Sequence, residues 1–118
     1  MSKSQNRPDL IFLGIDSGAT RTVVLTADAQ GRVHQRLELG PANLRLMDAS
    51  QLKSLFESVA KSVKNPSAIG IGMAGVRDST DERRITEAAQ EIWPRIPCAA
   101  THDPVSYTHL TLPTILRV

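Results

Sequence analysis

The chain has 118 residues, of which 41% are hydrophobic and 22% are charged, and this is typical of one soluble globular domain. Its 14 basic and 12 acidic residues give a net charge of +2, and aromatic residues make up only 3%. A nucleic-acid surface needs clustered positive charge or stacking aromatics, so no nucleic-acid partner is expected. The single cysteine, Cys98, excludes an internal disulfide and favours a reducing, cytoplasmic location.

The N-terminal segment, residues 1–9, is polar, and we expect it to be disordered. The apolar run that follows, residues 10–13, is far shorter than the core of a signal peptide or a membrane-spanning helix. The sequence therefore predicts no membrane partner.

Short apolar and β-branched runs between turn-forming residues predict strands, and two segments with apolar residues at helical spacing predict amphipathic helices. In chain order, the expected elements are strands at 10–15, 22–27 and 33–39, a helix at 52–63, a strand at 68–74, a helix at 79–93 and a strand at 96–101. The first three strands should form an antiparallel meander, and the two helical crossovers demand parallel pairing of the later strands. The sequence thus predicts an α/β fold with a mixed five-stranded sheet in the order β-β-β-α-β-α-β.

The starts of the two helices carry capping residues. Either Asp48 or Ser50 can cap the first helix, and residues 79–82 form a candidate capping box for the second. The charged residues near this second start, including Asp78 and Asp81, are expected to form a solvated face.

Residues 14–22, Gly-Ile-Asp-Ser-Gly-Ala-Thr-Arg-Thr, carry the main functional signal, because they join two strands through small residues. Gly18 can adopt a positive φ and Ala19 is small, so backbone N–H groups can approach phosphate oxygens. Hydroxyl groups that can also donate to phosphate belong to Ser17, Thr20 and Thr22. Asp16 supplies a charge that can hold Mg²⁺ through water. An ordinary hairpin turn accounts for the spacing equally well.

This segment resembles the first phosphate motif of the actin-like superfamily, and it is most similar to that of N-acetylglucosamine kinases and BadF/BadG/BcrA/BcrD-type ATPases. The resemblance implies an actin-like (ribonuclease H-like) lobe that uses ATP and Mg²⁺. It implies phosphate contacts from Gly14, Ser17, Gly18, Ala19, Thr20 and Thr22, and a water-mediated metal contact from Asp16. Ala19 stands where the family often has glycine.

Three later features resemble the same branch and follow in its order. Residues 40–43, Gly-Pro-Ala-Asn, resemble a loop whose asparagine, here Asn43, contacts the substrate. Residues 70–75 resemble a small-residue strand end that lines the substrate cleft and includes Gly75. Asp103 resembles the catalytic aspartate, so the resemblance implies that it binds the sugar and takes its proton as general base.

Two other functions remain open. The first is a BadF-type ATPase that activates a redox partner; such activators hold an iron–sulfur cluster with cysteines, and the single Cys98 does not support this role. The second is a dinucleotide-binding or structural α/β domain, because residues 70–75 also read Gly-x-Gly-x-x-Gly. A dinucleotide fingerprint needs its helix to begin within the glycines, whereas residues 76–78 intervene here.

The end of the chain carries a foreign pattern. Residues 105–114, Val-Ser-Tyr-Thr-His-Leu-Thr-Leu-Pro-Thr, match residue for residue the translation of a common transposon sequencing adapter. We therefore expect residues 104–118 to be non-native and residues 10–103 to be a truncated N-terminal nucleotide-binding lobe. The family's second phosphate motif and adenosine-binding motif are missing, so the fragment alone is expected to be inactive.

The expected full-length protein is a cytoplasmic, ATP-dependent kinase of N-acetylglucosamine or a related amino sugar. Its expected ligands are ATP, Mg²⁺ and the small sugar. A homodimer is left open.

Overall fold

The computed structural model describes residues 10–63 and 65–101. Its elements in chain order are β1 (Phe12–Ser17), β2 (Thr22–Ala27), β3 (Val33–Leu39), the 3₁₀ helix η1 (Leu44–Leu46), α2 (Ala49–Ser62), β4 (Ala68–Met73), α3 (Ser79–Ile92) and β5 (Cys98–Thr101). All five expected strands and both expected α-helices are present. The short helix η1 was not predicted from the sequence.

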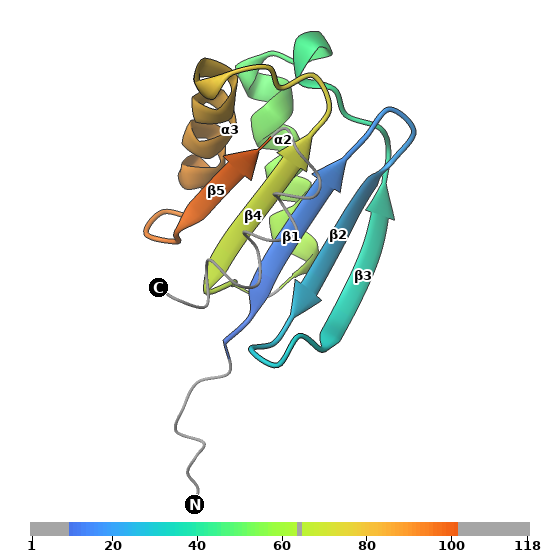
Figure 1. The fold of residues 1–118 in the computed structure, drawn as a ribbon, viewed down its shortest axis with the longest axis vertical. Coiled ribbons are helices and arrows are strands. Elements are labelled where there is room, and N and C mark those ends of the chain that lie inside the picture. Colours follow the sequence, from blue (N-terminus) through green and yellow to red (C-terminus); the bar gives the residue numbers. More distant parts are fainter. Residues whose placement is uncertain (1–9, 64, 102–118) are drawn as a thin grey trace, which may run out of the picture.

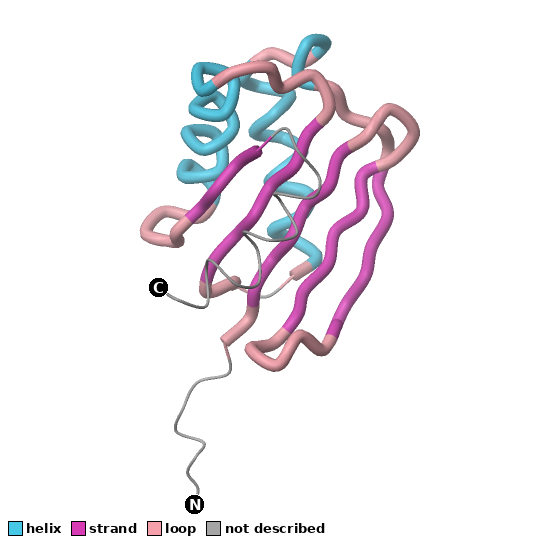
Figure 2. Tube along the Cα trace, viewed as in Figure 1, coloured by secondary structure: helices cyan, strands magenta, loops and turns pink. Residues whose placement is uncertain are grey.

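The strands form one mixed sheet in the order β3-β2-β1-β4-β5. Strands β1, β2 and β3 form an antiparallel meander, whereas β4 pairs in parallel with β1 on one side and with β5 on the other. Strand β1 is therefore central, and its carboxyl end lies beside the carboxyl end of β4. Both α-helices pack on the same face of the sheet (Figures 1 and 2).

The core lies between this face and the helices, because alternate residues of β1 and β4 point toward α2 and α3. Fully buried residues of the core include Leu13, Ile15, Ile69 and Ile71 from the strands and Phe56 and Ile85 from the helices. Each such side chain contributes about 1.5–3 kcal/mol when it leaves water. Phe56 also contacts Trp93, with ring centroids 5.9 Å apart, so the two helices are joined through aromatic packing.

The alternation also determines where the polar residues of β1 point. Leu13, Ile15 and Ser17 share the face that the helices cover, so Gly14 and Asp16 lie on the opposite face of the strand. Asp16 is the exposed residue of β1. The acidic residue of the proposed phosphate turn is thus kept out of the core.

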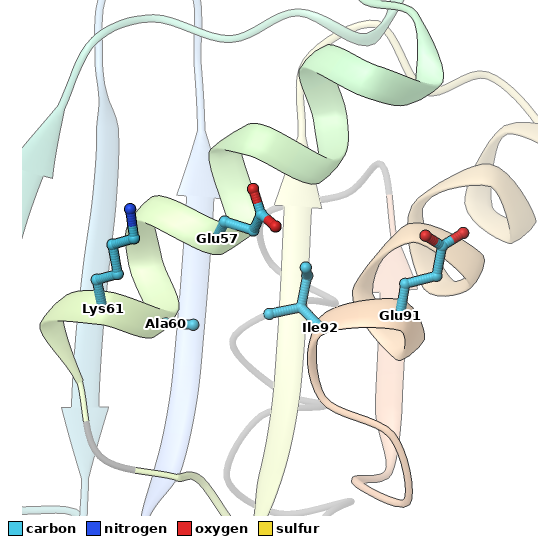
Figure 3. Close-up of a pocket in the computed structure, with 5 residues that line it drawn as sticks. All are labelled: Glu57, Ala60, Lys61, Glu91 and Ile92. Atoms are coloured by element: carbon cyan, nitrogen blue, oxygen red, sulfur yellow. The ribbon is translucent and has the colours of Figure 1, made fainter.

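A shallow groove of about 410 Å³ lies between the helices and is lined by Glu57, Ala60, Lys61, Glu91 and Ile92 (Figure 3). These residues come from the C-terminal halves of α2 and α3. Both helices begin near the carboxyl end of the parallel strands and run away from it, so the groove is remote from the β1–β2 turn. Within residues 10–63 and 65–101, no helix is long and apolar enough to cross a membrane.

Candidate functional site

The turn between β1 and β2 comprises residues 18–21. It is closed by a hydrogen bond from the Gly18 N–H to the Arg21 carbonyl oxygen, at 2.8 Å. Ala19 and Thr20 at its tip are exposed. Their backbone N–H groups have no hydrogen-bond acceptor among the described residues. The turn therefore presents adjacent free donors, which is the arrangement that binds an anion such as a phosphate group.

Gly18 does not adopt the positive φ that glycine allows; the described glycines with positive φ are Gly31 and Gly75. A Cβ placed on Gly18 would meet only the Arg21 carbonyl oxygen, at an ordinary 3.6 Å. The turn thus folds without needing glycine here. The absent side chain instead leaves room next to the free N–H groups.

The hydroxyl groups of Ser17 and Thr22 point into the protein, and the two residues are 2% and 0% exposed. The Thr22 hydroxyl oxygen lies 2.9 Å from the Gly40 carbonyl oxygen and 3.1 Å from the Ser17 hydroxyl oxygen. These contacts tie the base of the turn to the loop that follows β3. The Ala42 N–H adds a bond of 3.2 Å to the Gly18 carbonyl oxygen. Both hydroxyls are therefore engaged internally in this structure, whereas Thr20 faces solvent.

Asp16 lies at the carboxyl end of β1, where it pairs with Val23 of β2 and Gly72 of β4. It has no ion-pair partner among the described residues. An exposed carboxylate beside free N–H donors suits a cation bound together with an anion. Gly14 shares the face of Asp16 but lies in mid-strand, paired with Gly70, so it does not join the turn. No group of three or more candidate metal ligands occurs in the part of the chain that the structure describes.

Asn43 and Gly75 are brought together, although they lie far apart in the sequence. Asn43 forms a parallel β-bridge with Ala74 and caps η1, where its side-chain oxygen accepts a hydrogen bond of 2.9 Å from the Arg45 N–H. Gly75 has a φ of 90°, and a Cβ on it would overlap the Asn43 side-chain oxygen. Only glycine fits here, because both the backbone conformation and the close approach exclude a side chain.

These parts form one continuous rim. The Ala74 N–H donates to the Ser17 carbonyl oxygen at 2.8 Å, and the Leu44 N–H donates to the Ala74 carbonyl oxygen at 2.9 Å. The turn at 18–21, the loop with Asn43 and the segment with Gly75 thus meet at the carboxyl ends of β1 and β4 (Figure 1). Open α/β sheets bind ligands at this end of their strands.

The start of α3 differs from the expectation. Asp81 is not part of a solvated face but is buried, with 6% of its surface exposed. Burial alone would raise the pKa of Asp81. Hydrogen bonds from the Arg77 N–H and the Arg45 guanidinium outweigh this effect, so the pKa lies below its usual value. The N-cap of α3 is Asp78 rather than a residue of the expected capping box at 79–82. The Arg45–Asp81 ion pair gave no signal in the sequence, because its members are 36 residues apart.

Several expected features lie outside the described residues: the segment 1–9, the proposed general base Asp103 and the tail 104–118. Strand β5 ends at Thr101, two residues before Asp103, and it pairs in parallel with β4.

The glycines of the Gly-x-Gly-x-x-Gly pattern do not form a dinucleotide-binding turn. Gly70 and Gly72 lie inside the fully buried strand β4, and α3 begins only at Ser79. The helix start is therefore too far from these glycines to meet a pyrophosphate in the way a dinucleotide fold requires.

No protein-family model matches the chain, and no curated protein matches it in sequence. Among solved structures, it is similar to a candidate sugar kinase from Cytophaga hutchinsonii, with a TM-score of 0.59 and 15% identity over 86% of this chain and 40% of that one. It is also similar to a ROK family transcriptional regulator, a homologue of the E. coli MLC protein, with a TM-score of 0.51 and 14% identity over 81% of this chain and 28% of that one.

The chain spans 40% of the length of the first of these proteins and 28% of the second. At such identities the similarity concerns the fold. The expected fold class is confirmed: the chain has a mixed five-stranded α/β fold in the order β-β-β-α-β-α-β, and part of the candidate sugar kinase from Cytophaga hutchinsonii shares this fold.

Proposed function

We propose that the chain is the N-terminal nucleotide-binding lobe of an ATP-dependent kinase that phosphorylates N-acetylglucosamine or a related amino sugar. One observation carries the proposal: the turn with free N–H donors and the Asn43–Gly75 contact meet at the carboxyl ends of β1 and β4. In this proposal the phosphate groups of ATP and the second substrate bind next to each other at this end of the sheet, as transfer between two substrates requires. The sugar-kinase-like fold supports this assignment.

In this proposal the turn binds the phosphate groups of ATP. The free N–H groups of Ala19 and Thr20 donate to phosphate oxygens, and the bare Gly18 lets the nucleotide approach the backbone. Asp16 holds Mg²⁺ through water, since this ion dehydrates reluctantly. When bound, Mg²⁺ neutralises the charge that develops on the transferred phosphoryl group. Ser17 and Thr22 serve the site through their backbone and by fixing the base of the turn.

Asn43 is proposed to contact the sugar, and Gly75 keeps the space in which the Asn43 side chain lies. Asp103 is proposed to accept the proton of the attacking sugar hydroxyl as general base. We assign the remaining ATP contacts to a second lobe of the parent protein, which residues 10–103 do not include. We assign residues 104–118 to the translated adapter. Resequencing of the DNA across codon 104 tests this division.

The test of function uses the full-length protein recovered by resequencing, with Mg-ATP and a panel of neutral and N-acetylated sugars. We expect sugar-dependent ADP release, highest with an N-acetylated amino sugar. Asp103→Ala should lower kcat by about 10²–10⁴-fold, the usual contribution of a general base, and leave the Kd for ATP within about twofold.

Asp28→Ala, which changes an aspartate in the distant β2–β3 turn, serves as the control and should leave kcat unchanged. Near-normal turnover by Asp103→Ala would rule out the general-base role. ATP hydrolysis that no sugar stimulates would favour the activator ATPase instead.

A further inference from the structure

The short helix η1 carries Asn43 at its start and is held from two sides. Ala74, the residue directly after strand β4, holds one side by accepting a hydrogen bond from the Leu44 N–H at its carbonyl oxygen. The start of α3 holds the other side, because the Arg45 guanidinium pairs with the Asp81 carboxylate. The position of η1 therefore depends on a contact with a helix that begins more than 30 residues later in the sequence.

Asp81 needs its partners because it is buried. One carboxylate oxygen accepts from Arg45 and the other accepts from the Arg77 N–H at 3.0 Å. The Arg77 side chain also pairs with Asp81 but lies farther away, at 3.9 Å, so Arg45 is the closer of two cations that compensate this buried charge, and its loss is unfavourable. The ion pair is thus a firm attachment between η1 and α3, unlike an exposed pair on the surface.

A second bond attaches the end of η1 to the same helix. The Arg84 guanidinium donates to the Met47 carbonyl oxygen at 2.8 Å. Arg84 follows Asp81 by three residues, so both project from one side of α3. The first turns of α3 therefore hold η1 within its length, at Arg45, and just after its end, at Met47.

Arg45 links this attachment to Asn43. Its backbone N–H donates to the side-chain oxygen of Asn43 at 2.9 Å. Fixing Arg45 thus fixes which way the Asn43 amide is turned. Because its oxygen is engaged with Arg45, the Asn43 NH₂ group is the donor that is free to bind an acceptor atom.

We propose that Asp81 is a positioning residue for sugar recognition, which acts through Arg45 to orient the Asn43 NH₂ group toward an acceptor oxygen of the sugar. This inference rests on the proposed kinase function. Asp81 itself does not touch the substrate. The Asn43 NH₂ group can donate to the carbonyl oxygen of an acetamido group or to a sugar hydroxyl oxygen. It cannot donate to a sugar amine, because the amine is protonated at neutral pH and has no lone pair to accept a hydrogen bond.

The first experiment measures kinetics of Asp81→Asn in the full-length protein. Asparagine keeps the shape of aspartate but removes the charge that holds Arg45. We expect the KM for the sugar to rise about tenfold or more, since a small misplacement of a binding group has such effects, with the KM for ATP within about twofold. The matched control is Asp78→Asn at the N-cap of α3, where asparagine caps a helix as well as aspartate does, so both KM values should stay unchanged.

A second measurement does not depend on turnover. Hydrogen exchange of the backbone amides at 44–48 should become about tenfold faster or more in Asp81→Asn, because the loop loses its attachment, and the turn at 18–21 should keep its rate. Arg45→Gln breaks the same pair from its more exposed side and should reproduce both results if Asp81→Asn does not fold.

The outcomes separate the two proposals. Equal increases in the KM for ATP and for the sugar, or faster exchange with an unchanged sugar KM, would overturn the positioning role. Unchanged exchange at 44–48 would overturn it whatever the substrate is. A wild-type protein that phosphorylates no sugar, with faster exchange in Asp81→Asn, would refute the kinase function while showing that Asp81 holds the loop.

Discussion

At the scale of single residues, two glycines of the rim have different physical roles. Gly75 is required by the fold, because its φ is positive and a Cβ would overlap Asn43. Gly18 is not, because its backbone is ordinary and the space around it admits a Cβ. A glycine that the fold does not need, next to free N–H donors, is better explained by ligand approach.

This difference predicts the effect of Gly18→Ala in the full-length protein. The added methyl group should crowd the phosphate groups and raise the KM for ATP about tenfold, which corresponds to about 1.4 kcal/mol. The midpoint of urea unfolding should not fall, because the methyl group meets only the Arg21 carbonyl oxygen.

The matched control is Gly40→Ala, where a Cβ would meet nothing within 4 Å. It should change neither the KM for ATP nor the unfolding midpoint. A large loss of stability in Gly18→Ala would contradict the ligand-based explanation and return the glycine to a structural role.

The sequence predicts the turn, Asn43 and Gly75 as site residues, and the structure brings all three together at one end of the sheet; their binding roles stay a prediction. The sequence did not predict that α3 holds the loop with Asn43. The charged neighbours of Asp81 in the chain predict a solvated side chain. In the structure Asp81 is buried and paired with Arg45. This contact joins residues 36 positions apart, so no local sequence pattern predicts it.

At the scale of elements, the strands and α-helices could be predicted because each has a clear apolar period or a β-branched run. Helix η1 was missed for a physical reason. It has only three residues and no period of its own, and it forms because Asn43 caps it and β4 supports it. Strand β1 extends to Ser17, past the expected end at residue 15, because pairing with both β2 and β4 continues through these polar residues.

The start of α2 resolves an alternative that the sequence left open. Asp48 is the N-cap, and it exchanges side-chain hydrogen bonds with Gln51 in a capping box at 2.8 and 2.9 Å. Asp48→Ala should therefore lower the free energy of unfolding by about 1 kcal/mol, as measured by urea denaturation.

Ser50→Ala is the corresponding control, because Ser50 lies within the first turn of α2 and makes no cap. It should leave the free energy of unfolding within about 0.5 kcal/mol of the wild type. If Ser50→Ala were the more destabilising of the two, the cap assignment would be wrong.

At the scale of the whole molecule, the stability should depend on pH through Cys98. Burial raises the pKa of this thiol to about 12. An unfolded chain exposes the thiol, which then ionises near its ordinary pKa of about 8.5. The stabilisation is fully present below that value and is lost as pH rises toward the folded-state pKa.

We therefore expect the wild type to lose about 1–2 kcal/mol of stability by pH 10 relative to Cys98→Ala, when each is referred to its own value at pH 7. Urea denaturation of both proteins at pH 7 and pH 10 measures the difference, and other groups that titrate in this range cancel between them. Equal losses in the two proteins would show that the thiol is accessible in the folded state.

The sheet order places β3 and β5 at the two outer sides of the sheet, and unpaired backbone groups there invite another chain to add a strand. Among the described residues, strand β5 spans only four residues, and a short edge limits such pairing. Strand β3 is longer, but it carries exposed charges: Arg36 pairs with Glu38 at 2.7 Å, and Arg21 of the turn approaches Glu38 at 3.4 Å. Such surface pairs contribute little to folding stability. The charged residues instead affect solubility, because a charged edge strand is less prone to pair with the sheet edge of another molecule and aggregate.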